Sequence, residues 1–118
     1  MEKLLYRGIC TELENQIFSG QIAPGQKLPS VRILSARYGV NPNTVGRAVR
    51  ELQKTGLVIS LRGCGTIVTD DDQIILNWKH QRVRLLMKQF FNEMEGLGYT
   101  RTMVLDELQR KETNCTAV

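Results

Sequence analysis

A four-residue link, Gly39-Val40-Asn41-Pro42, separates two short segments in which apolar residues recur with helical spacing. Gly39 can end the first segment in the left-handed conformation, which glycine adopts without strain, and Asn41 can cap a new helix at Pro42. Because such a short link permits only a tight turn, the sequence predicts a helix-turn-helix. In this motif the second helix lays its N-terminal turn into the major groove of DNA.

The residues on both sides of this motif complete a small domain. Apolar residues recur at steps of three and four over residues 3–19, which predicts a first helix. After Gly56, branched residues at 57–61 and 66–69 flank a glycine turn and predict a β-hairpin. We therefore expect a mainly α fold with a small β-hairpin wing, that is, a winged helix-turn-helix DNA-binding domain over residues 1–69.

Residues 70–118 follow a different pattern, and we expect them to form a two-helix dimerisation region. Asp70-Asp71-Asp72 stands where a helix begins, so we interpret its carboxylates as a cap and a domain boundary. The helix after it carries an apolar stripe too wide for one small helix to bury, which indicates a homodimer. The predicted interface residues on this stripe are Ile75, Trp78, Val83, Leu86, Phe90, Met94 and Leu97.

Net charge also differs between these two regions. Residues 1–69 contain nine Lys and Arg against four Glu, a net charge of +5, whereas the remaining residues carry a net charge of −1. A basic domain joined to a nearly neutral one indicates binding to a polyanion. No apolar run approaches the roughly 18 residues that span a bilayer, and the N-terminus lacks a signal-peptide pattern. We therefore expect a cytoplasmic protein that does not bind membranes.

The sequence contains no recognisable catalytic or metal-binding arrangement. Cys10, Cys64 and Cys115 are far apart and form no C-x-x-C pair, which favours reduced thiols, and His80 is the one histidine. An enzyme needs a nucleophile with its base, paired carboxylates or a set of metal ligands. We therefore expect no enzyme activity, no catalytic residue, no bound metal and no cofactor. Without a resolving cysteine near it in the sequence, Cys64 is not expected to be an obligatory redox switch.

Several motifs occur in the order found in the GntR family of bacterial transcription regulators. Residues 24–32 are similar to the family pattern P-G-x-x-L-P-S-x-R, and residues 62–66 resemble its R-G-x-G-T wing. Residues 40–45 resemble the recognition-helix start of the YtrA-type branch, and the likeness covers residues 9–69. Residues 70–118 resemble the two short dimerisation helices of that branch. The resemblance implies a transcription regulator, with repression as the expected sign.

Two positions depart from the family pattern. Gly46 stands where many members carry an arginine or another polar residue, and Cys64 occupies a wing position that is often polar. Contacts that other members make at these two positions therefore do not transfer to this chain.

Nine residues are expected to contact DNA. A guanidinium at the start of the second helix suits phosphate or guanine, short polar groups at the recognition-helix start suit phosphate, and a basic glycine turn suits the minor groove. Along the recognition helix we expect Arg47 to reach deeper into the groove and Arg50 to lie nearer the DNA backbone. The alternative for either arginine is an ion pair with Glu51 or exposure to solvent. Capping alone is the alternative role for Ser30 and Asn41. The predicted contacts are Ser30, Arg32, Asn41, Asn43, Thr44, Arg47, Arg50, Arg62 and Gly63.

Taken together, these features predict a sequence-specific regulator that binds an inverted-repeat operator in double-stranded DNA as a homodimer. The alternative function is a winged helix that assembles proteins without operator specificity, because the fold alone does not establish DNA binding. A small-molecule effector remains open as a further partner.

Overall fold

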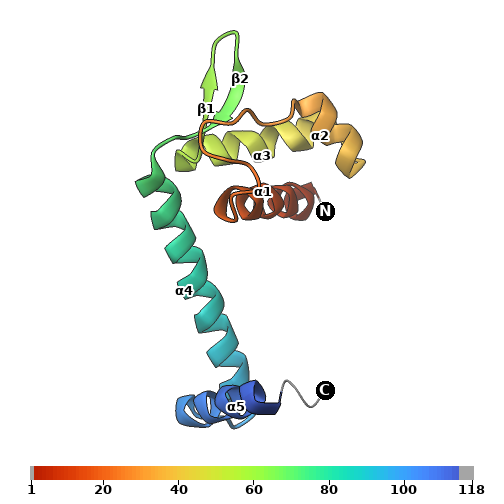
Figure 1. Cartoon of the computed structure of the whole chain (residues 1–118). Coiled ribbons are helices and arrows are strands. Elements are labelled where there is room, and N and C mark those ends of the chain that lie inside the picture. Colours follow the sequence, from red (N-terminus) through yellow and green to blue (C-terminus); the bar gives the residue numbers. More distant parts are fainter. Residues whose placement is uncertain (1, 115–118) are drawn as a thin grey trace. The chain divides into compact units, whose positions relative to one another are not determined.

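The computed structural model describes residues 2–114 and the side chains of residues 5–110, so the predicted free thiol of Cys115 lies outside the described residues. It contains five helices and one antiparallel hairpin, which confirms the expected fold class (Figure 1). The elements are α1 (Glu2–Phe18), α2 (Val31–Tyr38), α3 (Pro42–Thr55), β1 (Val58–Leu61), β2 (Gly65–Val68), α4 (Asp72–Gly96) and α5 (Arg101–Asn114).

The chain divides into two compact units, and the division falls within α4. The winged-helix unit comprises residues 1–79, and the C-terminal unit comprises residues 80–118. The expected domain boundary at residue 70 marks the end of the hairpin and the start of α4. The first turns of α4 thus belong with the winged helix.

The helices of the winged-helix unit enclose one apolar core. α3 packs against both α1 and α2. Leu13 of α1, Leu34 of α2 and Leu52 of α3 are almost completely buried, because the spacing of three and four turns one stripe of each helix inward. The buried apolar residues of this core are Tyr6, Ile9, Leu13, Ile17, Ile22, Leu28, Leu34, Val45, Ala48, Val49, Leu52, Leu57, Val58 and Val68.

Local capping fixes the helix-turn-helix. The Ser30 hydroxyl accepts a hydrogen bond from the backbone N–H of Ile33, and the Asn41 side chain accepts one from the N–H of Asn43 at 2.8 Å. Between the two helices Gly39 adopts a φ of 65°, where a side chain would cause strain. The predicted caps are confirmed, and they set the start and direction of α3.

The hairpin is anchored to the winged-helix core at its base. β1 and β2 pair in register from Val58 with Val68 to Leu61 with Gly65. The loop before α2 runs along β2, because Leu28 donates its N–H to Thr66 and Val68 donates its N–H to Gln26. The hairpin therefore projects from a base that is hydrogen-bonded on both sides.

The start of α4 is held by the winged helix. Asp71 accepts a hydrogen bond from the backbone N–H of Gln73 at 3.0 Å, which confirms a carboxylate cap in the acidic run. Ile75 packs against the core, and the indole N–H of Trp78 donates to the Thr55 carbonyl at 2.9 Å. Two of the predicted interface residues, Ile75 and Trp78, thus make contacts within their own chain.

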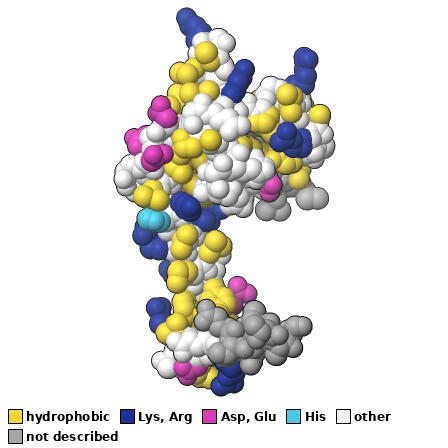
Figure 2. Space-filling view, in the orientation of Figure 1, with side chains coloured by type: hydrophobic (Ala, Val, Ile, Leu, Met, Phe, Trp, Pro, Cys, Tyr) yellow, Lys and Arg dark blue, Asp and Glu magenta, His cyan; other side chains and the backbone are white. Residues whose placement is uncertain are grey.

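The C-terminal unit buries little of its apolar surface. The part of α4 that it contains has no buried residue, and Val104 of α5 is the one buried side chain among the described residues of the unit. Val83, Leu86, Phe90 and Leu97 are all exposed. Figure 2 shows hydrophobic side chains along the surface of α4. Within the described part of the chain, no helix has the length and apolar character to cross a membrane.

Candidate nucleic-acid interface

The recognition helix α3 has one buried side and one polar side. Its inward residues are Thr44, Val45, Ala48, Val49 and Leu52. Asn43, Arg50 and Lys54 are exposed on the opposite side, because spacings of seven and four place them on one stripe. We define these three residues as the outer stripe of α3. Lys54 is paired with Glu51 at 3.2 Å, so Asn43 and Arg50 are the members of the stripe that are best suited to face a phosphate-lined groove.

Arg47 lies beside the outer stripe and is held by α1. Its guanidinium carbon lies 4.3 Å from the centre of the Tyr6 ring, the geometry of a cation–π contact. Tyr6 is itself buried, so it provides a fixed support. The ring therefore fixes the direction in which Arg47 projects.

A notch of about 200 Å³ opens at the N-terminal half of α3. Its lining combines two guanidinium groups with polar groups at the positive end of a helix, a combination that attracts phosphate. The residues that line it are Tyr6, Asn43, Thr44, Arg47 and Arg50. We refer to it as the α3 notch.

Arg50 folds back along the outer stripe over Gly46. A Cβ atom at Gly46 would lie 3.5 Å from the Nη1 atom of Arg50, which is ordinary van der Waals contact. The missing side chain at position 46 thus leaves space that the Arg50 guanidinium uses. Arg50 thus lies on the outer stripe, whereas Arg47 stacks on Tyr6 of α1, and their relative depth in a groove stays a prediction.

Thr44 differs from the other predicted contacts. Its side chain is only 5% exposed, and its backbone N–H donates to the Asn41 carbonyl at 3.0 Å. The buried side chain helps to pack the start of α3, yet the residue also lines the α3 notch. Its contact with DNA therefore stays a prediction.

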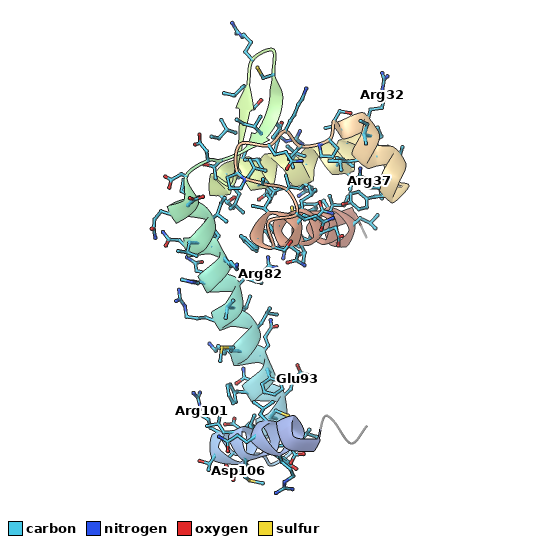
Figure 3. The ribbon with its side chains drawn as sticks, in the orientation of Figure 1. Arg32, Arg37, Arg82, Glu93, Arg101 and Asp106 are labelled. Carbon is cyan, nitrogen blue, oxygen red and sulfur yellow. The ribbon has the colours of Figure 1, made fainter. Side chains whose placement is uncertain are left out.

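The remaining predicted contacts lie on α2 and the hairpin turn. Arg32 is exposed in the first turn of α2, directly after the Ser30 cap, and Figure 3 shows it projecting on the side toward which the hairpin extends. Arg62 and Gly63 are exposed at the hairpin turn, where Gly63 has a φ of 80°. Figure 2 shows Lys and Arg side chains along this edge. We refer to the exposed cations of α2, α3 and the hairpin turn together as the basic edge of this unit.

Lys27 is a basic residue at this edge that sequence reasoning missed. It forms an isolated bridge with Ile67 of the hairpin, and its Cε atom lies 3.0 Å from the position of a Cβ at Gly65. The stem of Lys27 therefore packs against the hairpin and directs its ammonium along it. The sequence places Lys27 only in a turn-rich loop, so nothing local reveals this pairing.

Three helices followed by a hairpin, with a basic edge formed by α2, α3 and the hairpin turn, define a winged helix-turn-helix protein. The family model described as "Bacterial regulatory proteins, gntR family" matches residues 5–68. The chain belongs to this family. It is a DNA-binding transcription regulator, and members of the family are regulators rather than enzymes.

Similar proteins extend the comparison beyond the winged helix. The transcriptional repressor YtrA of Bacillus subtilis (strain 168) is 38% identical over 95 residues, which are 80% of this chain and 73% of the relative. The structure of a GntR family transcriptional regulator from Listeria monocytogenes has a TM-score of 0.84 at 30% identity and covers 90% of this chain and 93% of its own. AraR(DBD) in complex with operator ORR3 has a TM-score of 0.53 at 34% identity, over 54% of this chain and 77% of that one.

Proposed function

We propose that the protein is a repressor that acts in the bacterial cytoplasm and binds an inverted-repeat operator as a homodimer. The observation that carries the proposal is the α3 notch, which combines two guanidinium groups with the start of an exposed recognition helix. Repression is supported by the likeness to YtrA, which is named a repressor.

The C-terminal unit supports a homodimer. Its exposed apolar residues include Val83, Leu86 and Phe90 along α4, and Leu97 directly after the helix. A contiguous exposed apolar patch of this kind marks an interaction surface, and soluble homo-oligomers are most often two-fold dimers. A two-fold dimer presents two recognition helices, so its operator consists of two inverted half-sites. The proposed interface residues are Val83, Leu86, Phe90, Met94 and Leu97, with Ile75 and Trp78 holding α4 to the winged helix.

We assign base reading to Arg50 and phosphate contact to Arg47. Arg50 lies on the outer stripe above Gly46, where a guanidinium can meet a guanine edge in the major groove. Arg47 stacks on Tyr6 at the side of the notch, a fixed position that suits the DNA backbone. Gly46 is part of this arrangement, because the Arg50 guanidinium lies over it, at van der Waals distance from the position of a Cβ.

The other proposed contacts surround the recognition helix. Ser30 and Asn41 cap α2 and α3 and lie exposed at helix starts, where phosphate is favoured. Asn43 lies on the outer stripe beside the notch. Arg32, Lys27 and the hairpin turn with Arg62 and Gly63 supply cations and close backbone approach on either side.

Selection from a random duplex library tests the proposal. The purified protein is expected to enrich a motif with two inverted half-sites, and its affinity for that motif should exceed its affinity for scrambled DNA by at least about 1000-fold near physiological salt. The same titrations at several salt concentrations measure the number of phosphate contacts. A protein-assembly module would enrich no motif and would bind all duplexes weakly, an outcome that would contradict the proposal.

A further inference from the structure

A second basic cavity lies within the C-terminal unit, away from the winged helix in sequence. It has a volume of about 380 Å³ and is formed by α4 and the first residue of α5. Its lining residues are Arg84, Met87, Lys88, Phe91, Asn92 and Arg101. We propose that this cavity, the α4–α5 pocket, binds a small organic anion with a flat apolar portion, such as an aryl phosphate.

Positive charge is concentrated in the α4–α5 pocket. Arg84 and Lys88 are separated by four positions on α4, so they occupy the same face of the helix. Arg101 is the first residue of α5, and no side chain of the lining is acidic. Like charges that line one cavity repel one another, and a bound anion relieves that repulsion.

The start of α5 adds to this positive potential. Thr100 caps the helix, since its hydroxyl accepts a hydrogen bond from the N–H of Met103 at 3.2 Å. The N-terminal end of a helix carries partial positive charge and favours acidic residues in its first turn. α5 has no acidic residue there and begins instead with Arg101. The positive helix end and the three cations therefore act in the same direction.

The pocket also has an apolar wall with a fixed geometry. The guanidinium carbon of Arg101 lies 4.6 Å from the centre of the Phe91 ring, and Met87 lines the same cavity. Figure 3 shows Arg101 beside the C-terminal part of α4. This stacking orients Arg101 before a ligand arrives. A ligand ring packs against Phe91 and Met87 while its anionic group meets the cations.

The size of the cavity limits the ligand. Small-molecule sites typically have volumes of about 300–1000 Å³, so the α4–α5 pocket is near the lower end. It suits one or two rings with a phosphate or carboxylate. Its position on α4 and α5 couples ligand binding to dimer stability, since a ligand that favours one state shifts the population of that state. That coupling rests on the proposed function, whereas ligand binding itself does not.

Calorimetric titration of the full chain with phenyl phosphate tests the inference. We expect phenyl phosphate to bind, inorganic phosphate to bind more weakly, and phenol to give no measurable heat. Lys88→Gln and Arg101→Gln should each weaken phenyl phosphate binding by about tenfold, because each removes a charge-assisted contact. Phe91→Leu should reduce the affinity for phenyl phosphate and leave that for inorganic phosphate unchanged.

Lys79→Gln is the matched control, since it also removes one exposed lysine charge from α4 but lies outside the pocket lining. Circular dichroism verifies that each variant is folded. The inference is overturned if phenyl phosphate does not bind, or if Lys79→Gln weakens it as much as Lys88→Gln does. It is also overturned if the pocket variants lose only dimerisation, since carboxylates of a second copy would then be the occupant. Operator binding measured without ligand tests the proposed function separately.

Discussion

The winged-helix unit and the C-terminal unit both contain apolar helices, but they bury them to very different extents. Leu34 and Leu52 of the first unit are 1% exposed or less, whereas Leu86 and Phe90 of the second are 54% and 41% exposed. The first unit encloses a buried apolar core within one chain. The second does not, so its stability is expected to depend on a partner and therefore on protein concentration.

The largest expected effect comes from the core of the winged helix. Leu52→Ala should lower the free energy of unfolding by about 2–5 kcal/mol at every protein concentration, because it leaves a cavity among buried side chains. Leu86→Ala is the matched change on the exposed stripe, and at dilutions that favour monomer it should cost less than about 0.5 kcal/mol. Urea unfolding at low and high protein concentration measures both. If Leu86→Ala lowers the free energy of unfolding by a large amount at every protein concentration, the difference in burial between the two units does not have the consequence we expect.

The next effect concerns the exposed stripe itself. Phe90→Asp combined with Met94→Asp should give monomers, because charge is costly in an apolar interface. The affinity for the operator should then fall on the order of 100-fold, because a monomer cannot bind both half-sites at once. Gln81→Asp adds a carboxylate to α4 at an exposed polar position and should leave the dimer intact. If sedimentation shows an intact dimer for the double variant, the assignment of this stripe as the dimer interface is wrong.

The two units also differ in what their sequences reveal. The helix starts at Ser30 and Asn41 and the turn at Gly39 were predictable, since capping depends on residues within three positions. The spacing of apolar residues predicted that α4 carries an apolar stripe. The surface that covers this stripe was not predictable, because periodicity shows only that a face is apolar. Trp78 illustrates this limit, as its indole N–H binds the carbonyl of Thr55 in the same chain.

Prediction from the sequence has the same limit for the charged residues of α3. The sequence identified Arg47 and Arg50 as a pair one turn apart, but the direction in which Arg47 projects depends on Tyr6, which is 41 positions away from Arg47 along the chain. The packing of α1 against α3 creates that contact. Lys27 was missed for a similar reason, since only the bridge to Ile67 brings it to the hairpin. Contacts between distant segments require the fold.

Removal of the two arginines should separate base reading from phosphate contact. Arg50→Ala is expected to cost about 1–3 kcal/mol on the operator and to relax selectivity at one position in each half-site. Arg47→Ala should weaken binding to operator and scrambled DNA alike, and reduce the salt slope by about one unit per subunit. Binding titrations on both duplexes at several salt concentrations measure these effects. If Arg50→Ala lowers the affinity for operator and scrambled DNA equally, Arg50 does not read a base, and Arg47 is the candidate base reader, as the sequence predicted.

Tyr6→Leu is the control for the role of Arg47. It removes the ring beneath the guanidinium while keeping an apolar side chain at a buried position. Operator binding should weaken by about 0.5–1 kcal/mol, the usual size of a cation–π contact at an exposed site. In an Arg47→Ala background the same change should have no further effect on binding, as the double-mutant cycle requires if Tyr6 acts only through Arg47.

The smallest effects concern the two described cysteines, which differ in burial within one unit. The Cys10 thiol donates to the Ala48 carbonyl at 3.4 Å, and Cys64 is exposed at the hairpin turn. Burial raises the pKa of Cys10 from 9.0 to about 11, with smaller contributions from Glu14 and Glu51 in the same direction and an opposing one from Arg7. Because folding favours the protonated thiol, this contribution to stability is complete below about pH 9 and decreases as the pH rises toward 11.

Alkylation by N-ethylmaleimide measures this difference directly. In a Cys115→Ser background at about pH 8, Cys64 should react quickly while Cys10 stays largely unmodified, because the thiolate is the reactive form and a raised pKa makes it scarce. Cys64→Ser should bind the operator as the parent protein does under reducing conditions, since the residue is exposed and its hydrogen bond to the Leu61 carbonyl comes from the backbone N–H. Mild oxidation should also leave operator affinity of the parent unchanged. If oxidant lowers that affinity and Cys64→Ser abolishes the response, Cys64 is a redox switch. The hairpin would then respond to oxidation although no resolving cysteine lies near Cys64 in the sequence.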